Sequence, residues 1–369
     1  MTEAGRIDLD AVEAVIPNLK RRYSGVTATN RTIAPLIAGR CEAVWFGPDR
    51  PDGIAGLSLL DLVRLRFRPP KGRRARIWHA RRNTEMLLGL VLKGLGFRLK
   101  LVFTSAGQRR KTAYTNFLIA RMDAVIATSA VSASFVERPA TVIHHGVDLD
   151  LYKPPADRAA EYAATGLPGR YGIATFGRVR KQKGSDLFVE AMCRLLPKYP
   201  DFAAVIVGHV SADNAQFVDR LKGRAAAAGL SERIRFLGER PIEEVPLWYR
   251  RVSITVFASR VEGFGLTLLE AMAAENAVIA TRAGAAELVI DDGDTGFLAP
   301  VDDVDALAAA IEPMMRAPER IPTIGARARV RIARDFSRER EADEIVAVYR
   351  RVWEGAGAGG ANQASAASS

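Results

Sequence analysis

Two glutamates, eight positions apart, flank a glycine turn in the stretch from Ala258 to Ala274. An apolar run, Ile254–Ala258, precedes the turn and is typical of a buried parallel strand. The segment Leu266–Ala274 follows it, and its leucine, alanine and methionine content favours a helix. A strand, a glycine turn and a helix in this order direct backbone N–H groups and a positive helix end to the carboxyl edge of a sheet. Such an edge is a natural anion site.

Glu262 precedes the turn and Glu270 lies inside the predicted helix, so both carboxylates can face one cleft. Carboxylates accept hydrogen bonds and can hold vicinal hydroxyl groups. A phosphate-binding helix end between two such acids suits a nucleotide sugar. The same spacing also fits an ordinary buried turn with one solvated and one capping glutamate, because glycine turns are common in α/β proteins.

Arg178 and Lys183 follow the first predicted strand of the second half, Tyr171–Phe176. A diphosphate leaving group gains negative charge as its bond to a sugar breaks, and fixed cations stabilise that charge directly. We interpret the pair as such cations. A solvated basic loop is the alternative, because Arg180 and Lys181 lie beside them.

Polar residues also gather where a strand of the first half gives way to a helix. The strand Ala75–Trp78 is followed directly by His79, Arg81, Arg82 and Asn83. Catalytic groups concentrate at such strand ends in open α/β sheets. For His79, a hydrogen-bonded structural role fits the sequence equally well.

The charge of the chain is +11 over 369 residues, and it is unevenly placed. Between Arg64 and Lys111 there are fifteen Lys or Arg and one acid, Glu85. Such a field attracts polyanions, namely nucleic acid, anionic lipid or a phosphorylated sugar, although it also fits a basic soluble surface. Two distant cysteines give no disulfide framework, which suits a reducing cytoplasm, and no apolar run is long enough to cross a membrane. The N-terminus lacks the features of a signal peptide.

The elements that position these residues alternate between strands and helices, which is the signature of a parallel sheet covered on both sides. Such elements are expected in two series, before and after a linker at Leu151–Gly169 that is rich in proline and glycine. The length also favours two domains. We predict domains at 1–160 and 169–337, a C-terminal helix at 338–354 that packs toward the first domain, and a disordered tail at 355–369.

Several chemistries are poorly supported. No GxGxxG follows the first strand of either half, and GxxxxGK[ST] is absent, so neither nicotinamide oxidoreduction nor P-loop hydrolysis is favoured. There is no HExxH and no acid cluster with metal-ligand spacing, so we expect no metal.

The motifs together resemble a known family. GRVRKQKGSD and FASRVEGFGLTLLEAMA are similar to the retaining glycosyltransferases with the GT-B fold, in the family with sucrose-synthase-like and mannosyltransferase-like members. Glu262 and Glu270 match its E-x7-E element. HHGVDLDLYKP resembles its interdomain segment, with His145 in place of Asn, and RAGAAELVIDDGDTGFLAPVDD resembles a third element, with Ala285 in place of a second Gly. The resemblance implies an α/β GT-B fold, with two Rossmann-like doubly wound domains facing a central cleft.

The resemblance also implies roles, carried over residue by residue. Arg178 and Lys183 hold the donor diphosphate, and Glu270 binds the ribose. The remaining donor contacts come from Glu262 and the backbone of Gly263, Phe264, Gly265, Leu266 and Thr267, with Gly25 in a closing loop and Arg240 beside the base. The family needs no metal or other cofactor and retains anomeric configuration, because attack occurs on the face of the departing phosphate, which then acts as the base. Many relatives have a histidine after the strand equivalent to Leu99–Phe103; this chain does not, so either His79 does that work or no histidine does.

A narrower resemblance rests on NLKRRYSGVT, HARRNTEM and TSAGQRRKT. These are similar to the lipopolysaccharide inner-core mannosyltransferases of alphaproteobacteria, which implies GDP-mannose as donor and a Kdo-containing glycolipid as acceptor. Kdo carries carboxylates and lipid A carries phosphates, so a basic acceptor domain is expected. The expected acceptor-binding residues are Arg81, Arg82, Asn83, Arg109, Arg110 and Lys111.

The same basic field predicts a peripheral position on the inner face of the cytoplasmic membrane, held by its anionic surface. A same-fold nucleotide-sugar epimerase and a transferase using a UDP-sugar remain alternatives. A nucleic-acid-binding protein is a remote one, and no nucleic acid partner is expected. The aromatic residues among the cations, Phe67, Trp78, Phe97 and Phe103, lie mostly in apolar runs and are interpreted as core.

Overall fold

The computed structural model describes residues 7–20 and 25–355. Part of the NLKRRYSGVT motif, residues 21–24, and the tail after Gly355, which was predicted to be disordered, lie outside these ranges. The chain divides into two compact units. Unit 1 is Met1–Gly146 together with Arg338–Ser369, and unit 2 is Val147–Ser337. Each unit has a parallel sheet between helices, which confirms the predicted α/β class with two doubly wound domains.

Unit 1 contains a seven-stranded sheet in the order β3-β2-β1-β4-β5-β6-β7. All its pairings are parallel, and most of its strands are apolar runs buried on both faces, as expected for a covered parallel sheet. The short β3 was not predicted, because two of its three residues are exposed and no apolar run marks it. The strands are β1 (Ala14–Pro17), β2 (Ala43–Phe46), β3 (Ala55–Leu57), β4 (Arg76–Ala80), β5 (Leu99–Ser105), β6 (Ala124–Ala127) and β7 (Thr141–Val142).

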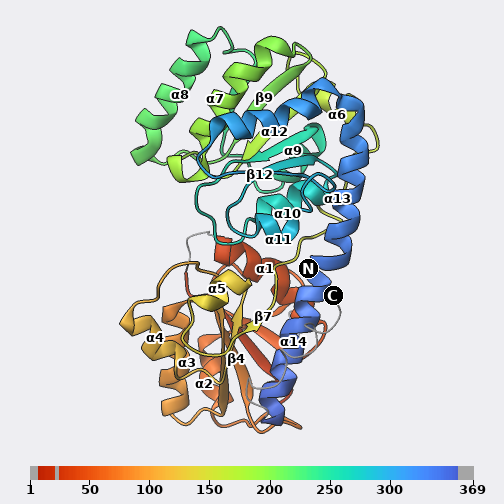
Figure 1. The fold of residues 1–369 in the computed structure, drawn as a ribbon. Helices are drawn as coiled ribbons and strands as arrows, with labels where there is room; N and C mark the ends of the chain where they lie inside the picture. Colours follow the sequence, from red (N-terminus) through yellow and green to blue (C-terminus); the bar gives the residue numbers. More distant parts are fainter. Residues whose placement is uncertain (1–6, 21–24, 356–369) are drawn as a thin grey trace, which may run out of the picture. The chain divides into compact units, whose positions relative to one another are not determined.

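Helices cover both faces of this sheet. On one face α1 (Gly25–Ala38) and the C-terminal helix α14 (Arg338–Glu354) form one apolar cluster with the strands. On the other face α2 (Leu59–Leu65), α3 (Asn83–Gly94) and α4 (Ala113–Ile119) form a second cluster. Figure 1 shows α2, α3 and α4 on one side of β4 and α14 on the other. The short helix α5 (Ala130–Ser134) connects β6 to β7.

Unit 2 contains a six-stranded parallel sheet in the order β10-β9-β8-β11-β12-β13. Its central strands are almost fully buried and mostly apolar, and two of them match the strands predicted at Tyr171–Phe176 and Ile254–Ala258. The strands of this sheet are β8 (Tyr171–Phe176), β9 (Phe202–Val207), β10 (Ile234–Gly238), β11 (Ile254–Phe257), β12 (Ala277–Thr281) and β13 (Phe297–Ala299).

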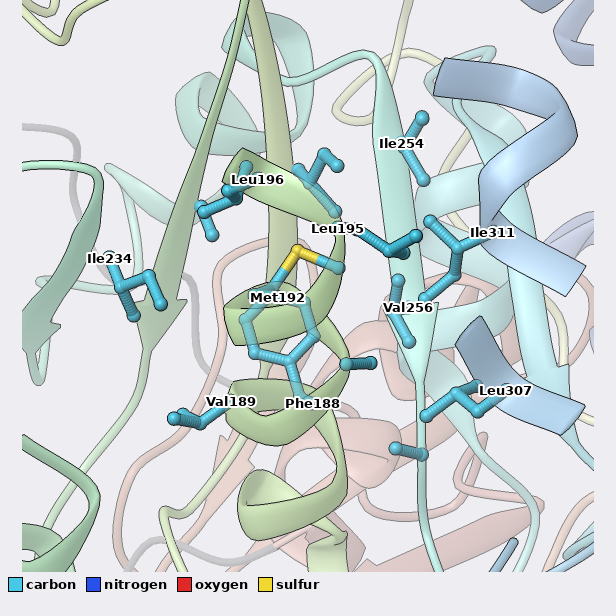
Figure 2. Close-up of a cluster of buried hydrophobic side chains, with 14 of the residues drawn as sticks. Phe188, Val189, Met192, Leu195, Leu196, Ile234, Ile254, Val256, Leu307 and Ile311 are labelled. Atoms are coloured by element: carbon cyan, nitrogen blue, oxygen red, sulfur yellow. The ribbon is translucent and has the colours of Figure 1, made fainter. Parts of the chain in front are cut away.

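The helices of unit 2 pack in two layers. One layer contains α7 (Ser185–Leu195), α8 (Ala215–Ala227) and α12 (Val304–Arg316). The other contains α9 (Val245–Arg251), α10 (Leu266–Ala273), α11 (Ala286–Val289) and much of α13 (Ile321–Asp335). Figure 2 shows the first layer's core, in which side chains of α7 meet those of β10, β11 and α12. The segment predicted as a linker lies within unit 2, which begins at Val147, and holds a further helix, α6 (Arg158–Ala163), capped by the side chain of Asp157.

Both sheets reverse their strand order at one point. In unit 1 the reversal lies between β1 and β4, and in unit 2 it lies between β8 and β11. Loops leave such a point in opposite directions and open a crevice at the carboxyl ends of the strands, where ligands bind in this class of fold. In the ranges that the structure describes, no helix is long and apolar enough to cross a membrane.

Candidate active site

The loops after β8 and β11 are joined at the reversal point of unit 2. The N–H of Arg260 donates to the carbonyl of Gln182 at 2.9 Å. Gly184 has φ +68°, and a Cβ there would lie only 1.8 Å from the carbonyl oxygen of Ala258. Only glycine permits this approach and this backbone conformation. The two loops therefore carry their side chains at a fixed separation.

An ion pair between Lys183 and Glu262 closes this junction. The second carboxylate oxygen of Glu262 accepts the N–H of Gly263 at 3.0 Å. The loop after β12 supports Glu262 from behind: Gly284 has φ +67°, and a Cβ there would lie 2.9 Å from the Cβ of Glu262. The next residue, Ala285, has φ −101°, which any residue adopts. This explains why alanine can stand at the second glycine position of the motif.

Glu270 lies on α10, partly buried, where its carboxylate accepts the hydroxyl of Tyr249 at 2.7 Å. Burial raises the pKa of Glu270, while the hydroxyls of Tyr249 and Tyr152 and the charge of Lys183 act in the opposite direction. Lys183 therefore interacts electrostatically with both glutamates of the E-x7-E pair. The structure brings these three side chains together, as the sequence predicts.

Arg178 is exposed on the loop after β8 and makes no hydrogen bond or ion pair among the described residues. A cation in this state is available to a ligand. Arg240 follows the edge strand β10 at the carboxyl end of the same sheet, and its buried Nε has no hydrogen-bond partner within the described chain.

The N-terminus of α10 supplies backbone donors at the same edge. Gly265 caps the helix with φ +105°, so the first N–H groups, including those of Leu266 and Thr267, have no partner within the helix. The side chain of Phe264 is buried in the core, so any ligand contact would come from its backbone. Gly25, predicted to help close over the donor, is the first residue of α1 in unit 1.

Unit 1 contains a cavity of about 410 Å³ at the carboxyl end of its sheet. The predicted residues Arg81, Asn83, Arg109, Arg110 and Lys111 all line it. Among the lining residues that the structure describes there is no carboxylate. Four cations around a space without an acid give a field that favours an anionic ligand.

Arg81 is the most unusual of these residues. It is only 8% exposed, yet its Nε and Nη2 have no hydrogen-bond partner in the described chain. Burial lowers the pKa of this guanidinium, and Glu341, Tyr349 and Glu85 oppose that effect. A buried guanidinium with two nitrogens lacking a protein partner is costly, and such nitrogens are normally satisfied by water, an ion or a ligand.

Arg82 does not reach the cavity. Its guanidinium donates to the side chains of Asn18 at 2.8 Å, Glu85 at 2.8 Å and Thr27 at 2.7 Å. Glu85 is fully buried one turn further along α3, and it holds Arg82 inside the reversal point. The expected acceptor contact is therefore corrected to a structural link between the segments that follow β1 and β4.

His79 is likewise turned inward. It lies within β4 and is 1% exposed. Its Nδ1 pairs with the hydroxyl of Tyr349 at 2.6 Å and its Nε2 with that of Thr104 at 2.7 Å. Burial, together with Arg81, holds the pKa of His79 well below its usual range. With both nitrogens occupied, this neutral ring fits the structural alternative.

Two residues of α14 that the sequence did not single out, Glu341 and Tyr349, contact residues at or behind the cavity. Glu341 accepts His145 Nδ1 at 3.0 Å and the N–H of Gly146 at 2.8 Å. Although burial acts to raise it, the pKa of Glu341 lies below its usual value because His145, Arg81 and the Gly146 N–H stabilise the carboxylate. Tyr349 holds His79. The sequence predicts that this helix packs toward the first domain, but it does not indicate which of its side chains meet His145 and His79, 196 and 270 positions earlier.

Comparison with known proteins places these features in context. A family profile described as "Glycosyl transferases group 1" matches residues 158–331. The chain is 50% identical over 344 residues to the lipopolysaccharide core biosynthesis mannosyltransferase LpcC of Rhizobium leguminosarum bv. viciae, which covers 93% of this chain and 97% of that protein. It is 42% identical over 349 residues to the mannosyltransferase LpsB of Rhizobium meliloti (strain 1021), covering 93% and 98%.

Solved structures share the fold. The crystal structure of Anabaena HepE in complex with UDP and glucose superposes with a TM-score of 0.76 over 92% of this chain and 99% of that one, at 19% sequence identity. Within the described residues, no group of three or more His, Cys, Asp or Glu side chains could hold a metal ion.

Proposed function

This chain belongs to the group 1 glycosyl transferases, and on that premise we propose that it transfers a mannosyl residue from GDP-mannose to an anionic glycolipid of the lipopolysaccharide inner core. The named relatives LpcC and LpsB, to which the chain is similar over nearly its whole length, support the sugar and the class of acceptor. The acceptor would carry the carboxylates of Kdo and the phosphates of lipid A.

The observation that carries the acceptor assignment is the cavity of unit 1. It is lined by four cations and no described carboxylate, and its buried Arg81 lacks partners at two nitrogens. A planar carboxylate or a phosphate would supply two acceptors in the fork geometry that a guanidinium matches. An uncharged acceptor would leave Arg81 unpaired.

The donor side is supported by the group at the reversal point of unit 2. In the proposed reaction the bond between the anomeric carbon and the phosphate oxygen breaks, and Arg178 and Lys183 take up the charge that the diphosphate gains. The acceptor hydroxyl bonds to the anomeric carbon on the same face, and its proton passes to the departing phosphate. Configuration is then retained, and the chain's own residues bind, orient and stabilise charge.

Lys183 is paired with Glu262 in the structure, and this pair would be rearranged by the donor. A diphosphate competes with the carboxylate for the ammonium group, which would free Glu262 to meet the sugar hydroxyls. The carboxylate of Glu270, which is hydrogen-bonded by the hydroxyls of Tyr249 and Tyr152, would accept hydrogen bonds from the ribose hydroxyls. Arg240 would border the base.

We further propose that the protein works at the cytoplasmic face of the membrane, because its acceptor is a lipid and its net charge of +11 attracts anionic headgroups.

A donor screen tests the function. The protein is incubated with GDP-mannose or with UDP-sugars, with and without a Kdo-containing lipid A, and nucleotide release is measured. Release that needs both GDP-mannose and the acceptor is the expected result. Release without an acceptor would favour an epimerase of the same architecture, and no release with any donor would contradict the proposal.

A further inference from the structure

The outer side of α2, α3 and α4 exposes many apolar side chains. Of the sixteen large apolar side chains that are exposed in the described chain, nine lie in or within two residues of these three helices. One is Phe67, at 72% exposed, so the prediction that it belongs to the core is wrong. Contiguous exposed apolar surface usually marks an interaction site. We call these nine residues the outer face: Leu59, Leu60, Val63, Phe67, Leu87, Val91, Leu95, Tyr114 and Phe117.

The helices are apolar on two sides. Leu87 and Val91 of α3 and Leu95 at its C-terminal cap recur every fourth residue and form one exposed stripe, while Met86 and Leu92 are buried against the sheet. A helix that covers a sheet usually has a polar outer side. The second apolar side therefore calls for a second apolar neighbour, which no described part of unit 1 provides.

The three helices form one continuous surface. Helix α3 packs against α4, and Asn83 at its start donates to Thr115 of α4 at 2.9 Å. A Cβ at Gly96, just after α3, would lie 3.6 Å from Nε of Arg66 at the end of α2. Figure 1 shows the three helices on the same side of the sheet. The outer face is thus a layer and not a set of scattered side chains.

The segment that carries this face is rich in cations, and five of them pair with acids from outside it, namely Arg68, Lys71, Arg73, Lys93 and Lys100. Between Leu59 and Arg121 the sequence has sixteen Lys or Arg and two acids, and both acids are engaged, Asp61 by Arg64 and Glu85 by Arg82. Other arginines of this segment, listed next, are exposed and form no ion pair with a described residue. They are Arg66, Arg74, Arg109 and Arg110.

This chemistry identifies the occupant. The guanidinium of Arg66 lies 5.3 Å from the ring centre of Phe67, so a positive charge and an exposed aromatic ring lie side by side on the surface. Apolar side chains that enter the acyl boundary and arginines that meet phosphates are the two components of interfacial membrane binding. A second copy of the chain fits poorly, because a twofold contact would set the same cations against each other.

We propose that the outer face is the surface by which the protein lies on an anionic lipid bilayer, with these apolar side chains inserted among the headgroups. The face adjoins the cavity, because Thr112 and Thr115 of the α4 region line the cavity while Tyr114 between them belongs to the face. A lipid-linked acceptor can then place its sugar in the cavity while its chains stay in the bilayer. This orientation rests on the proposed function, whereas membrane docking itself does not.

Vesicle flotation with the full-length protein tests the docking surface. The double variant Phe67→Ser, Val91→Ser is compared with the matched control Ile242→Ser, Val330→Ser, which removes two equally exposed apolar side chains from unit 2. Wild type and control are expected to float with vesicles of phosphatidylcholine and phosphatidylglycerol, and to bind phosphatidylcholine alone more weakly. The double variant should bind the anionic vesicles about tenfold or more weakly, with an unchanged unfolding midpoint because both side chains are exposed.

Three results would overturn the inference. They are no binding of wild type to anionic vesicles, equal binding of the double variant and wild type, and a wild-type dimer in sedimentation that the double variant turns into a monomer. The assay contains neither donor nor acceptor, so it is independent of the sugar transferred. A protein that binds the vesicles through this face but releases no nucleotide would refute the proposed function and leave the docking surface standing.

Discussion

Replacing Arg81 by methionine should separate the stability of unit 1 from its function. Two nitrogens of this guanidinium are buried without partners. An unsatisfied buried polar group costs about 1–3 kcal/mol, and an apolar side chain of similar length removes that cost. The attraction between Arg81 and Glu341 is lost at the same time. We therefore expect the free energy of unfolding to stay constant or to rise by about 1 kcal/mol.

Activity should change in the opposite direction. Each hydrogen bond from a charged donor to a ligand anion contributes about 1.5–3 kcal/mol, so losing one such contact lowers kcat/KM for the acceptor roughly 10- to 150-fold. The KM for the donor should not change, because the predicted donor residues other than Gly25 lie in unit 2. The assay follows nucleotide release while the acceptor is varied at saturating donor. Thermal unfolding is recorded in parallel.

Two further variants sharpen this experiment. Arg81→Lys keeps the charge but not the planar fork, so it should recover only part of the activity. Arg98→Met removes an exposed arginine of the same unit and should leave kcat/KM for a water-soluble acceptor fragment unchanged. The reasoning about Arg81 fails if Arg81→Met keeps wild-type kcat/KM, or if its activity falls only in proportion to a lowered unfolding midpoint.

Three other predictions concern charged groups. Lys183→Ala should lower kcat roughly a hundredfold, because a fixed hydrogen-bond donor to the developing charge is lost. The control Lys198→Ala removes an exposed lysine and should leave kcat unchanged. Equal effects of the two substitutions on kcat would refute the role assigned to Lys183. Burial raises the pKa of Glu270, so as the pH is lowered, donor affinity should begin to fall at a pH above the ordinary pKa range of glutamate. In Tyr249→Phe, which removes a hydrogen bond that lowers this pKa, calorimetry should show the fall at a still higher pH. An unshifted dependence of donor affinity on pH would argue against a role for the hydrogen bond. The pKa of Glu341 is depressed, so its stabilisation is full above the unfolded pKa and is lost as the pH falls through the folded one; Glu341→Gln should cost about 1–3 kcal/mol in urea unfolding at neutral pH, and a difference that does not shrink in acid would contradict this.

The strands of both units, except the short β3, and the group around Glu262 followed from the sequence because their determinants are local. Buried parallel strands are continuous apolar runs that glycines end, so their limits can be seen in the chain itself. The donor residues lie in loops directly after such strands. Because the carboxyl ends of parallel strands meet at one edge, Lys183 and Glu262 had to approach each other once the strand order placed β8 beside β11.

The sequence could not distinguish the roles of neighbouring residues of the same type, because those roles depend on contacts with residues far away in the chain. Arg81 and Arg82 are adjacent and of one type, yet one lines the cavity and the other is held by Glu85 and Asn18. The orientation of each depends on which way its strand end turns and on what lies there. The same holds for His79, whose burial requires Tyr349 from α14.

By itself, the sequence determined two doubly wound sheets and the positions in the chain of the anion-binding turns, because apolar runs and glycines act on the backbone next to them. Tertiary structure alone decided which cations have no partner, that the outer side of α2 and α3 exposes apolar side chains, and that Glu341 of the C-terminal helix meets His145. Those outcomes depend on contacts between residues far apart in sequence, which residue types and their spacing along one chain do not predict.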